Sequence, residues 1–231
     1  MSGERLDRIL AAFEASSGDR TSPPQICEVT THIVGVAGAG VMLISKDVPQ
    51  GSLCTSNSVT ELMEDLQYTL GEGPGIDAYE SDDVVAEADL ANPDVPRWLA
   101  FTPRVLDVGV RAVFGFPLRG GEVRMGALNL YKDRPGALSE EQHSDALVMA
   151  DCIGQWVLDA QSDASPGDLA GVIESSSDFH FIVHNAAGMV SVQLDVPVTE
   201  ALVRLRAHAF AENQLLRDVA ADVVEHRFRF A

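Results

Sequence analysis

Residues 110–131 read VRAVFGFPLRGGEVRMGALNLY, and this stretch decides the fold of the first two thirds of the chain. It holds two apolar runs, 110–118 and 125–131, with Gly120-Gly121 between them. Two such runs around a Gly-Gly pair are typical of an antiparallel β-hairpin. Phe114 and Phe116 alternate along the first run, so they are predicted to share one face of the sheet.

Other elements are predicted on both sides of this hairpin. Strands are predicted at 41–45, 52–55 and 84–86, with a turn at 49–51. Helices are predicted at 6–15, 23–36, 59–70, 98–106 and 139–160, and Ser139 with Gln142 forms a capping box at the start of the last one. The glycines at 71, 73 and 75 are interpreted as a structural turn. Helices before and after an antiparallel sheet predict α+β packing, with the helices covering one face of the sheet.

Composition and charge exclude several function classes. The chain has 231 residues, of which 46% are hydrophobic and 22% charged, a globular composition. No apolar run approaches the roughly 20 residues that cross a bilayer, and the polar start lacks a secretory signal, so we expect a cytoplasmic protein without a membrane segment. The net charge is −19, which repels nucleic-acid backbones at long range. Any nucleic-acid binding must therefore come from a few local groups.

Catalytic and metal-binding motifs are absent from the sequence. It contains no G-x-S-x-G, no P-loop and no H-E-x-x-H, so we expect neither catalysis nor a metal site. The three cysteines, Cys27, Cys54 and Cys152, are odd in number and widely spread. They are expected to be reduced and to fill the core rather than form a disulfide framework.

A second domain is predicted after a change in amino-acid composition. Residues 161–178 are rich in Ser, Asp and Gly and are interpreted as a linker. The chain from 179 onward has apolar residues at helical spacing in three short segments, which predicts an all-α three-helix bundle. The predicted organisation is therefore a first domain at 1–160, a linker at 161–178 and a second domain at 179–231. Because three short helices bury little area, dimerisation or packing on the first domain is expected.

The first domain resembles a known family. Residues 68–78, YTLGEGPGIDA, followed by the hairpin and the closing helix, resemble a GAF domain over about residues 20–160. Gly75-Ile76 depart from the pattern, since related domains of actinobacterial regulators often carry Cys and a small residue there. The resemblance implies an α+β GAF-like sandwich that senses an unidentified small molecule or protein signal. The candidate pocket residues are aromatic: Tyr68, Trp98, Phe101, Phe114 and Phe116.

The second domain resembles another family. The segments 185–190 (NAAGMV), 200–209 (EALVRLRAHA) and 218–224 (DVAADVV) resemble the ANTAR domain, a three-helix RNA-binding module. The resemblance implies a homodimer that binds paired RNA hairpins in transcription antitermination. The candidate RNA-binding residues are Arg204, Arg206, His208, Arg217, Arg227, His180 and His184. Two positions depart from the family pattern: Ala187 stands where many members carry Lys, and Leu215 stands where a helix N-cap is expected.

The sequence thus favours a signal-responsive RNA-binding regulator. The helix predicted at 139–160 is a candidate dimer interface. Two alternatives stay open. One is a ligand-binding or protein-interaction module whose helical domain has lost RNA binding, which the acidic charge and Ala187 favour. The other is a DNA-binding helix-turn-helix regulator, which needs base-reading side chains at the start of the third helix, where Leu215 and Leu216 are apolar.

Overall fold

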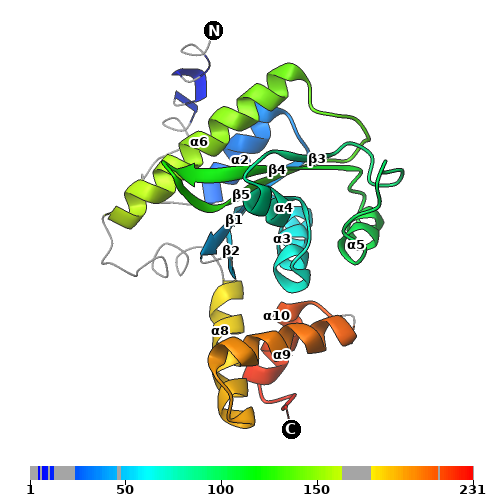
Figure 1. The fold of residues 1–231 in the computed structure, drawn as a ribbon, viewed down its shortest axis with the longest axis vertical. Helices are drawn as coiled ribbons and strands as arrows, with labels where there is room; N and C mark the ends of the chain where they lie inside the picture. The colour runs from blue at the N-terminus through cyan, green and yellow to red at the C-terminus, as the bar shows by residue number, and fades with distance from the viewer. Residues whose placement is uncertain are drawn as a thin grey trace.

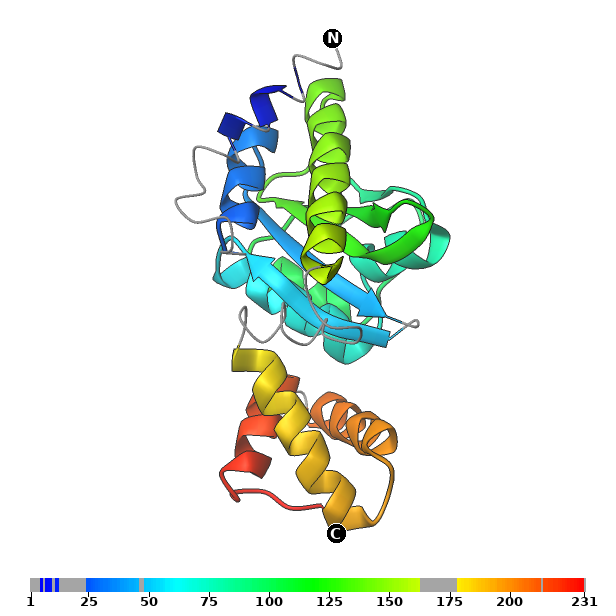
Figure 2. The same cartoon turned by 90° about the vertical axis from the view of Figure 1, so that its left-hand side faces the viewer.

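The computed structural model describes residues 5, 7–9, 11–12, 24–45, 48–162, 178–212 and 214–230. The described chain forms two units stacked along the long axis of the molecule (Figures 1 and 2). We call residues 24–162 the sheet unit and residues 178–230 the helical unit. Most of the predicted linker lies outside the described residues, and so does half of the predicted helix at 6–15.

The sheet unit is built on five antiparallel strands in the order β2-β1-β5-β4-β3. These are β1 (Gly38–Ser45), β2 (Val48–Thr55), β3 (Val85–Glu87), β4 (Ala112–Gly120) and β5 (Val123–Lys132). The predicted hairpin is confirmed as β4–β5, turning where Gly121 adopts a positive φ of 65°. The turn predicted at 49–51 is wrong, because Pro49 and Gly51 pair with β1 inside an irregular edge strand.

Helices cover both faces of the sheet, so the prediction that they cover one face is wrong (Figure 2). On one face lie α2 (Pro24–Val34) and α6 (Glu140–Ser162), and on the other lie α3 (Ser58–Leu70), α4 (Pro74–Ser81) and α5 (Phe101–Asp107). The reason is visible in β1, where Val41 and Leu43 point to the first layer while Met42 and Ile44 point to the second. A strand that is apolar on both sides needs cover on both sides.

The glycine-rich segment joins α3 to α4 rather than forming only a turn. Gly71 ends α3 in the left-handed region with φ 67°, and Gly73 precedes α4 with φ 142°. Pro74 then opens α4, a helix that the sequence did not predict. Between the two glycines, Glu72 accepts hydrogen bonds from the backbone N–H groups of Ala100 and Phe101, at 2.7 and 2.8 Å. The segment therefore fixes the start of α5 as well.

The expectation of three reduced cysteines is also wrong. Cys27 on α2 and Cys54 on β2 form a disulfide, with 6.0 Å between their Cα atoms. The packing of α2 across β2 brings the two residues into disulfide range, which their separation in sequence does not reveal. Cys152 on α6 is free and half-buried.

The helical unit consists of α8 (Asp178–Leu194), α9 (Val198–Ala211) and α10 (Leu216–Val224). The three helices enclose a common core of Val183, Ala186, Ala187, Val190, Ala201, Leu205, Ala209, Leu216, Val219, Ala220 and Val223. Ala187, the position at which many ANTAR domains carry Lys, is part of this core and is 1% exposed. No side chain caps the start of α10 at Leu215, as expected. Asn213, between α9 and α10, lies outside the described residues.

No single described helix has the length and apolar content to span a bilayer. Residues 182–194 and 198–211 reach that content only when taken together, and they are bent by 104° at their junction.

Candidate functional site

The two units meet where α3 of the sheet unit faces α9 and α10 of the helical unit, a contact that we call the seam. Arg217 of α10 forms an ion pair with Glu61 of α3, at 2.7 Å between Nη1 and Oε1. The same guanidinium lies 3.4 Å from the carboxylate of Asp65, which is buried. One of the predicted RNA-binding arginines is therefore held by carboxylates of the other unit.

A second predicted arginine is also held at the seam. The guanidinium of Arg206 on α9 lies over the ring of Tyr68 on α3, 4.4 Å from its centroid. Tyr68 is only 2% exposed, and its ring belongs to the apolar core of the helical unit. Nε and Nη2 of Arg206 are buried and have no hydrogen-bond partner among the described residues. Arg206 thus makes a cation–π contact with Tyr68, while two nitrogens of its guanidinium group lack hydrogen bonds within the described part of the chain.

Apolar residues cross the seam in both directions. Tyr68 from the sheet unit packs among the core residues of the helical unit. In return, Leu215 from the helical unit packs against a sheet-unit cluster that contains Met63 and Leu66. This packing explains why an apolar residue stands at the N-cap position of α10, where a polar cap was expected.

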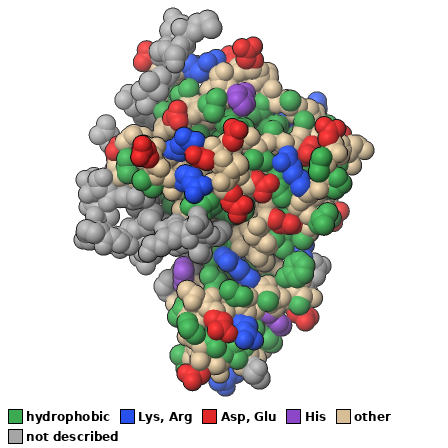
Figure 3. All heavy atoms as spheres, in the orientation of Figure 1, with side chains coloured by type: hydrophobic (Ala, Val, Ile, Leu, Met, Phe, Trp, Pro, Cys, Tyr) green, Lys and Arg blue, Asp and Glu red, His purple; other side chains and the backbone are tan. Residues whose placement is uncertain are grey.

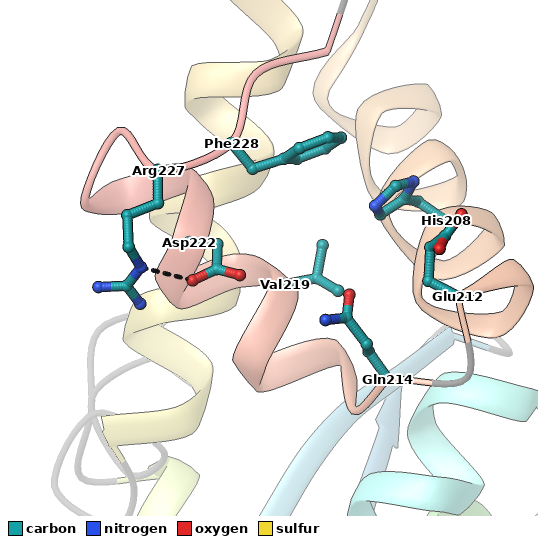
Figure 4. A pocket seen from close by; sticks show the side chains of 7 residues that line it. All are labelled: His208, Glu212, Gln214, Val219, Asp222, Arg227 and Phe228. Carbon is teal, nitrogen blue, oxygen red and sulfur yellow. Dashed lines mark hydrogen bonds and ion pairs between the residues drawn. The ribbon is translucent and has the colours of Figure 1, made fainter.

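A hollow of about 430 Å³ lies between α9, α10 and the C-terminal segment (Figure 4). It brings together two further predicted residues, His208 and Arg227. The His208 ring stacks on Phe228 at 4.4 Å between centroids, and Arg227 pairs with Asp222 at 2.7 Å and also with Glu225. The hollow is lined by His208, Glu212, Gln214, Val219, Asp222, Arg227 and Phe228, a mixture of both charge signs.

The remaining predicted RNA-binding residues lie apart from these two places. Arg204 pairs with Glu200 one turn away on α9, at 3.0 Å. His184 is exposed on α8, while the side chain of His180 lies outside what the structure describes. On the face shown in Figure 3, acidic and basic side chains are interspersed. The predicted RNA-binding residues thus fall into three groups: two arginines at the seam, two residues at the hollow, and the rest isolated from both.

The predicted aromatic pocket residues do not line one cavity. Phe114 and Phe116 share the sheet face under α2 and α6, as predicted. Trp98 and Phe101 lie in a cluster on the opposite face, and Tyr68 belongs to the core of the helical unit. The sheet itself separates the first pair from the second, because Phe114 and Phe116 point to the layer of α2 and α6 while Trp98 and Phe101 belong to the layer on the other face.

A buried polar cluster that the sequence did not predict lies on the α3/α4 face of the sheet. Asn129 in the central strand β5 lies between Gly40 of β1 and Gly115 of β4 in one cross-strand row. Its Nδ2 donates to Oε1 of Glu64 on α3 at 2.8 Å. Beside them, Gln67 accepts a 2.7 Å hydrogen bond from the backbone N–H of Gly75. The available signal was a glycine, Gly115, and a polar residue, Asn129, within two predicted strands.

Glycine makes this close approach possible. A Cβ on Gly40 would lie 2.5 Å from Oε1 of Glu64, and one on Gly115 would lie 2.2 Å from the carbonyl oxygen of Pro74. The cluster still leaves three polar atoms without a partner among the described residues: Oε2 of Glu64, Nε2 of Gln67 and Oδ1 of Asn129. It therefore offers unpaired hydrogen-bonding atoms in a fully buried place.

Burial changes the ionisation of two neighbouring carboxyls on α3. Desolvation raises the pKa of Glu64 from 4.5 to about 8, with the Asn129 hydrogen bond opposing it and the charge of Asp65 adding to it. Desolvation also raises the pKa of Asp65 from 3.8 to about 7, although Arg217 lowers it. No group of three or more metal-ligating side chains occurs in the part of the chain that the structure describes.

Solved structures show what fold this arrangement belongs to. The GAF domain of a phosphoenolpyruvate-protein phosphotransferase from Coxiella burnetii matches with a TM-score of 0.52 and 14% identity, covering 69% of this chain and 94% of that one. The GAF domain of the Acinetobacter phosphoenolpyruvate-protein phosphotransferase matches with a TM-score of 0.50 and 14% identity, over 71% and 99% of the two chains. The sheet unit therefore has the fold of a GAF domain.

Another match is the far-red absorbing dark state of JSC1_58120g3 with bound biliverdin IXa, at a TM-score of 0.50 and 12% identity over 68% and 99% of the two chains. No protein-family model and no curated protein matches the sequence.

Proposed function

We propose that the protein is a non-catalytic cytoplasmic regulator that acts as a homodimer, in which the sheet unit senses a signal and the helical unit binds RNA hairpins in transcription antitermination. One observation carries the RNA part of the proposal. Arg206 and Arg217 come from different helices, yet both face the same side of the helical unit, where they meet α3. The resemblance of residues 185–224 to the ANTAR domain supports the same assignment.

The chemistry of these two residues suits a folded RNA. A guanidinium pairs with phosphate oxygens through paired N–H groups and also stacks on an unpaired loop base. Arg217 already binds carboxylate oxygens and Arg206 already lies over an aromatic ring, so each residue makes one of these two kinds of contact within the protein. Since the chain has a net charge of −19, nonspecific affinity for nucleic acid is expected to be low.

The sensing part of the proposal rests on the fold of the sheet unit. A match with the same fold, JSC1_58120g3, carries biliverdin IXa, so the fold accommodates a bound small molecule in that protein. In this chain the buried cluster of Glu64, Gln67 and Asn129 has unpaired hydrogen-bonding atoms that suit a polar ligand. A signal bound there shifts the population toward the RNA-binding arrangement.

A binding experiment with a tandem-hairpin RNA tests the RNA part. Wild-type protein, Arg206→Ala and Arg217→Ala are compared across a salt series, with Arg134→Ala, an exposed residue of the sheet unit, as the charge-matched control. Loss of a phosphate contact is expected to reduce the slope of log K against log salt by about 1. Each seam variant should therefore bind more weakly than the control. Equal affinity of all four proteins would remove these arginines from the RNA interface.

One observation favours a second candidate, a ligand-binding or protein-interaction module without RNA affinity. The arginines among the predicted RNA-binding residues all have an acidic or aromatic partner in the protein: Arg204, Arg206, Arg217 and Arg227. If this candidate is correct, neither the hairpin RNA nor a duplex DNA of equal length binds at low salt. Preference for the duplex would instead indicate the DNA-binding alternative.

A further inference from the structure

One face of α3 contacts both seam arginines. Glu61, Asp65 and Tyr68 are spaced i, i+4 and i+7, so they lie on the same side of the helix. The carboxylates hold Arg217 and the ring holds Arg206. The two arginines belong to separate helices of the helical unit, so a single helix of the sheet unit contacts both.

We propose that this face of α3 is an intramolecular competitor of RNA: it occupies Arg206 and Arg217 in a closed arrangement, and RNA binds only after the seam opens. The inference rests on the proposed function, since it assumes that these two arginines contact RNA. It adds a specific inhibitory surface, made by Glu61, Asp65 and Tyr68 of the same chain.

The competitor presents the chemistry that RNA would present. Carboxylate oxygens take charge-assisted hydrogen bonds from a guanidinium, as phosphate oxygens do. An aromatic ring receives a guanidinium on its face, as a nucleobase does. Glu61 and Asp65 therefore occupy the place of a phosphate on Arg217, while Tyr68 occupies the place of a base on Arg206. The same side chains cannot serve both partners at once.

The closed arrangement contains features that limit its stability. The Arg217–Glu61 pair is partly exposed, with 37% and 52% of the side chains accessible, so salt screens it. Nε and Nη2 of Arg206 are buried and lack hydrogen-bond partners among the described residues. Against this, Tyr68 packs into the core of the helical unit, and Leu215 packs against an apolar cluster of the sheet unit. The screened ion pair and the unpaired nitrogens therefore favour opening, whereas the apolar contacts favour the closed arrangement.

The test removes the competing charges without touching the arginines. In Glu61→Gln/Asp65→Asn, both carboxylates become neutral amides of similar shape. Glu80→Gln, which neutralises an exposed residue of α4 in the same unit, serves as control. Two properties are measured on the full chain: the radius of gyration by small-angle X-ray scattering, and the affinity for the tandem-hairpin RNA at fixed salt.

The expected result is a larger radius of gyration and tighter RNA binding for the double variant, with the Glu80→Gln control unchanged. The apparent dissociation constant equals the intrinsic constant divided by the open fraction, so a seam that is about 90% closed weakens RNA binding about tenfold. The double variant should recover most of that factor. Unchanged size and affinity would overturn the proposal, because the carboxylates would then not hold the seam.

The remaining outcomes separate this proposal from the proposed function. If the double variant opens and binds RNA no more tightly than a wild type that also binds, competition is refuted while RNA binding stands. If it opens and no form binds RNA, the proposed RNA function is refuted and the competition with it. The charge-reversed pair Glu61→Arg/Arg217→Glu checks the contact itself. We expect it to be as compact as wild type, whereas Glu61→Arg alone should open the seam by placing like charges together.

Discussion

Replacing Glu64 with Gln tests whether the centre of the α3/α4 layer holds a buried ionisable group. Burial raises the pKa of this carboxyl from 4.5 to about 8. The folded protein therefore keeps a proton that the unfolded chain releases as the pH rises above 4.5. Because the folded state binds more protons than the unfolded state in this range, the free energy of unfolding falls as the pH rises.

The magnitude follows from the span between the two pKa values. At about 1.4 kcal/mol per pH unit, the span from 4.5 to about 8 corresponds to about 5 kcal/mol of stability lost between these limits. Below pH 4.5 the group is protonated in both states and contributes no pH dependence, and above about pH 8 the loss is complete. Glu64→Gln cannot ionise, so its stability relative to wild type should rise by about this amount from pH 4.5 to pH 8.

The assay is denaturant unfolding at several pH values, followed by tryptophan fluorescence. Both tryptophans of the chain, Trp98 and Trp156, lie in the sheet unit, so the signal reports that unit. Glu122→Gln, an exposed residue in the β4–β5 turn, controls for the loss of one carboxylate. The slope of the difference against pH is the measured quantity, and it is insensitive to any constant effect of the amide. Parallel curves for wild type and Glu64→Gln would refute the assignment.

Two further predictions concern the sheet unit. Thiol titration of the denatured protein should give one free thiol, Cys152, without reductant and three with it. Reduction of Cys27–Cys54 should lower the free energy of unfolding by about 2–4 kcal/mol. Three thiols in the untreated protein would contradict the disulfide. Gly115→Ala should destabilise the unit by about 1–3 kcal/mol in chemical denaturation, since its Cβ would lie 2.2 Å from the backbone oxygen of Pro74, and an unchanged midpoint would show that α4 moves away freely.

Local patterns predicted the elements that depend on near neighbours. The β4–β5 hairpin follows from two apolar runs around Gly120-Gly121, and the capping box appears with Ser139 and Gln142 bonded to each other at 3.0 and 3.1 Å. Helix α4 was missed because its start, Pro74, lies within a glycine-rich run that was interpreted as a turn. Glycines at a helix boundary and glycines in a plain turn give the same local signal.

The candidate site was predicted by residue type but not by arrangement. Arg206 and Arg217 were both named from the sequence, yet their partners on α3 lie far away in the chain. The sequence around Glu61 and Asp65 carries no sign of this contact, because nothing local distinguishes a solvated carboxylate from one that meets an arginine of another unit. The buried pair of Glu64 and Asn129 was missed for the same reason.

The sequence by itself determined most of the segments that become strands and helices, α4 excepted, and which side chains carry positive charge in the helical unit, because both depend on residue identity and short spacings. Only the tertiary structure decided that helices cover both faces of the sheet, that Cys27 meets Cys54, and that α3 holds the two arginines. These are contacts between residues distant in sequence. They are fixed by the joint burial of apolar surface from several elements, a quantity that no single segment contains.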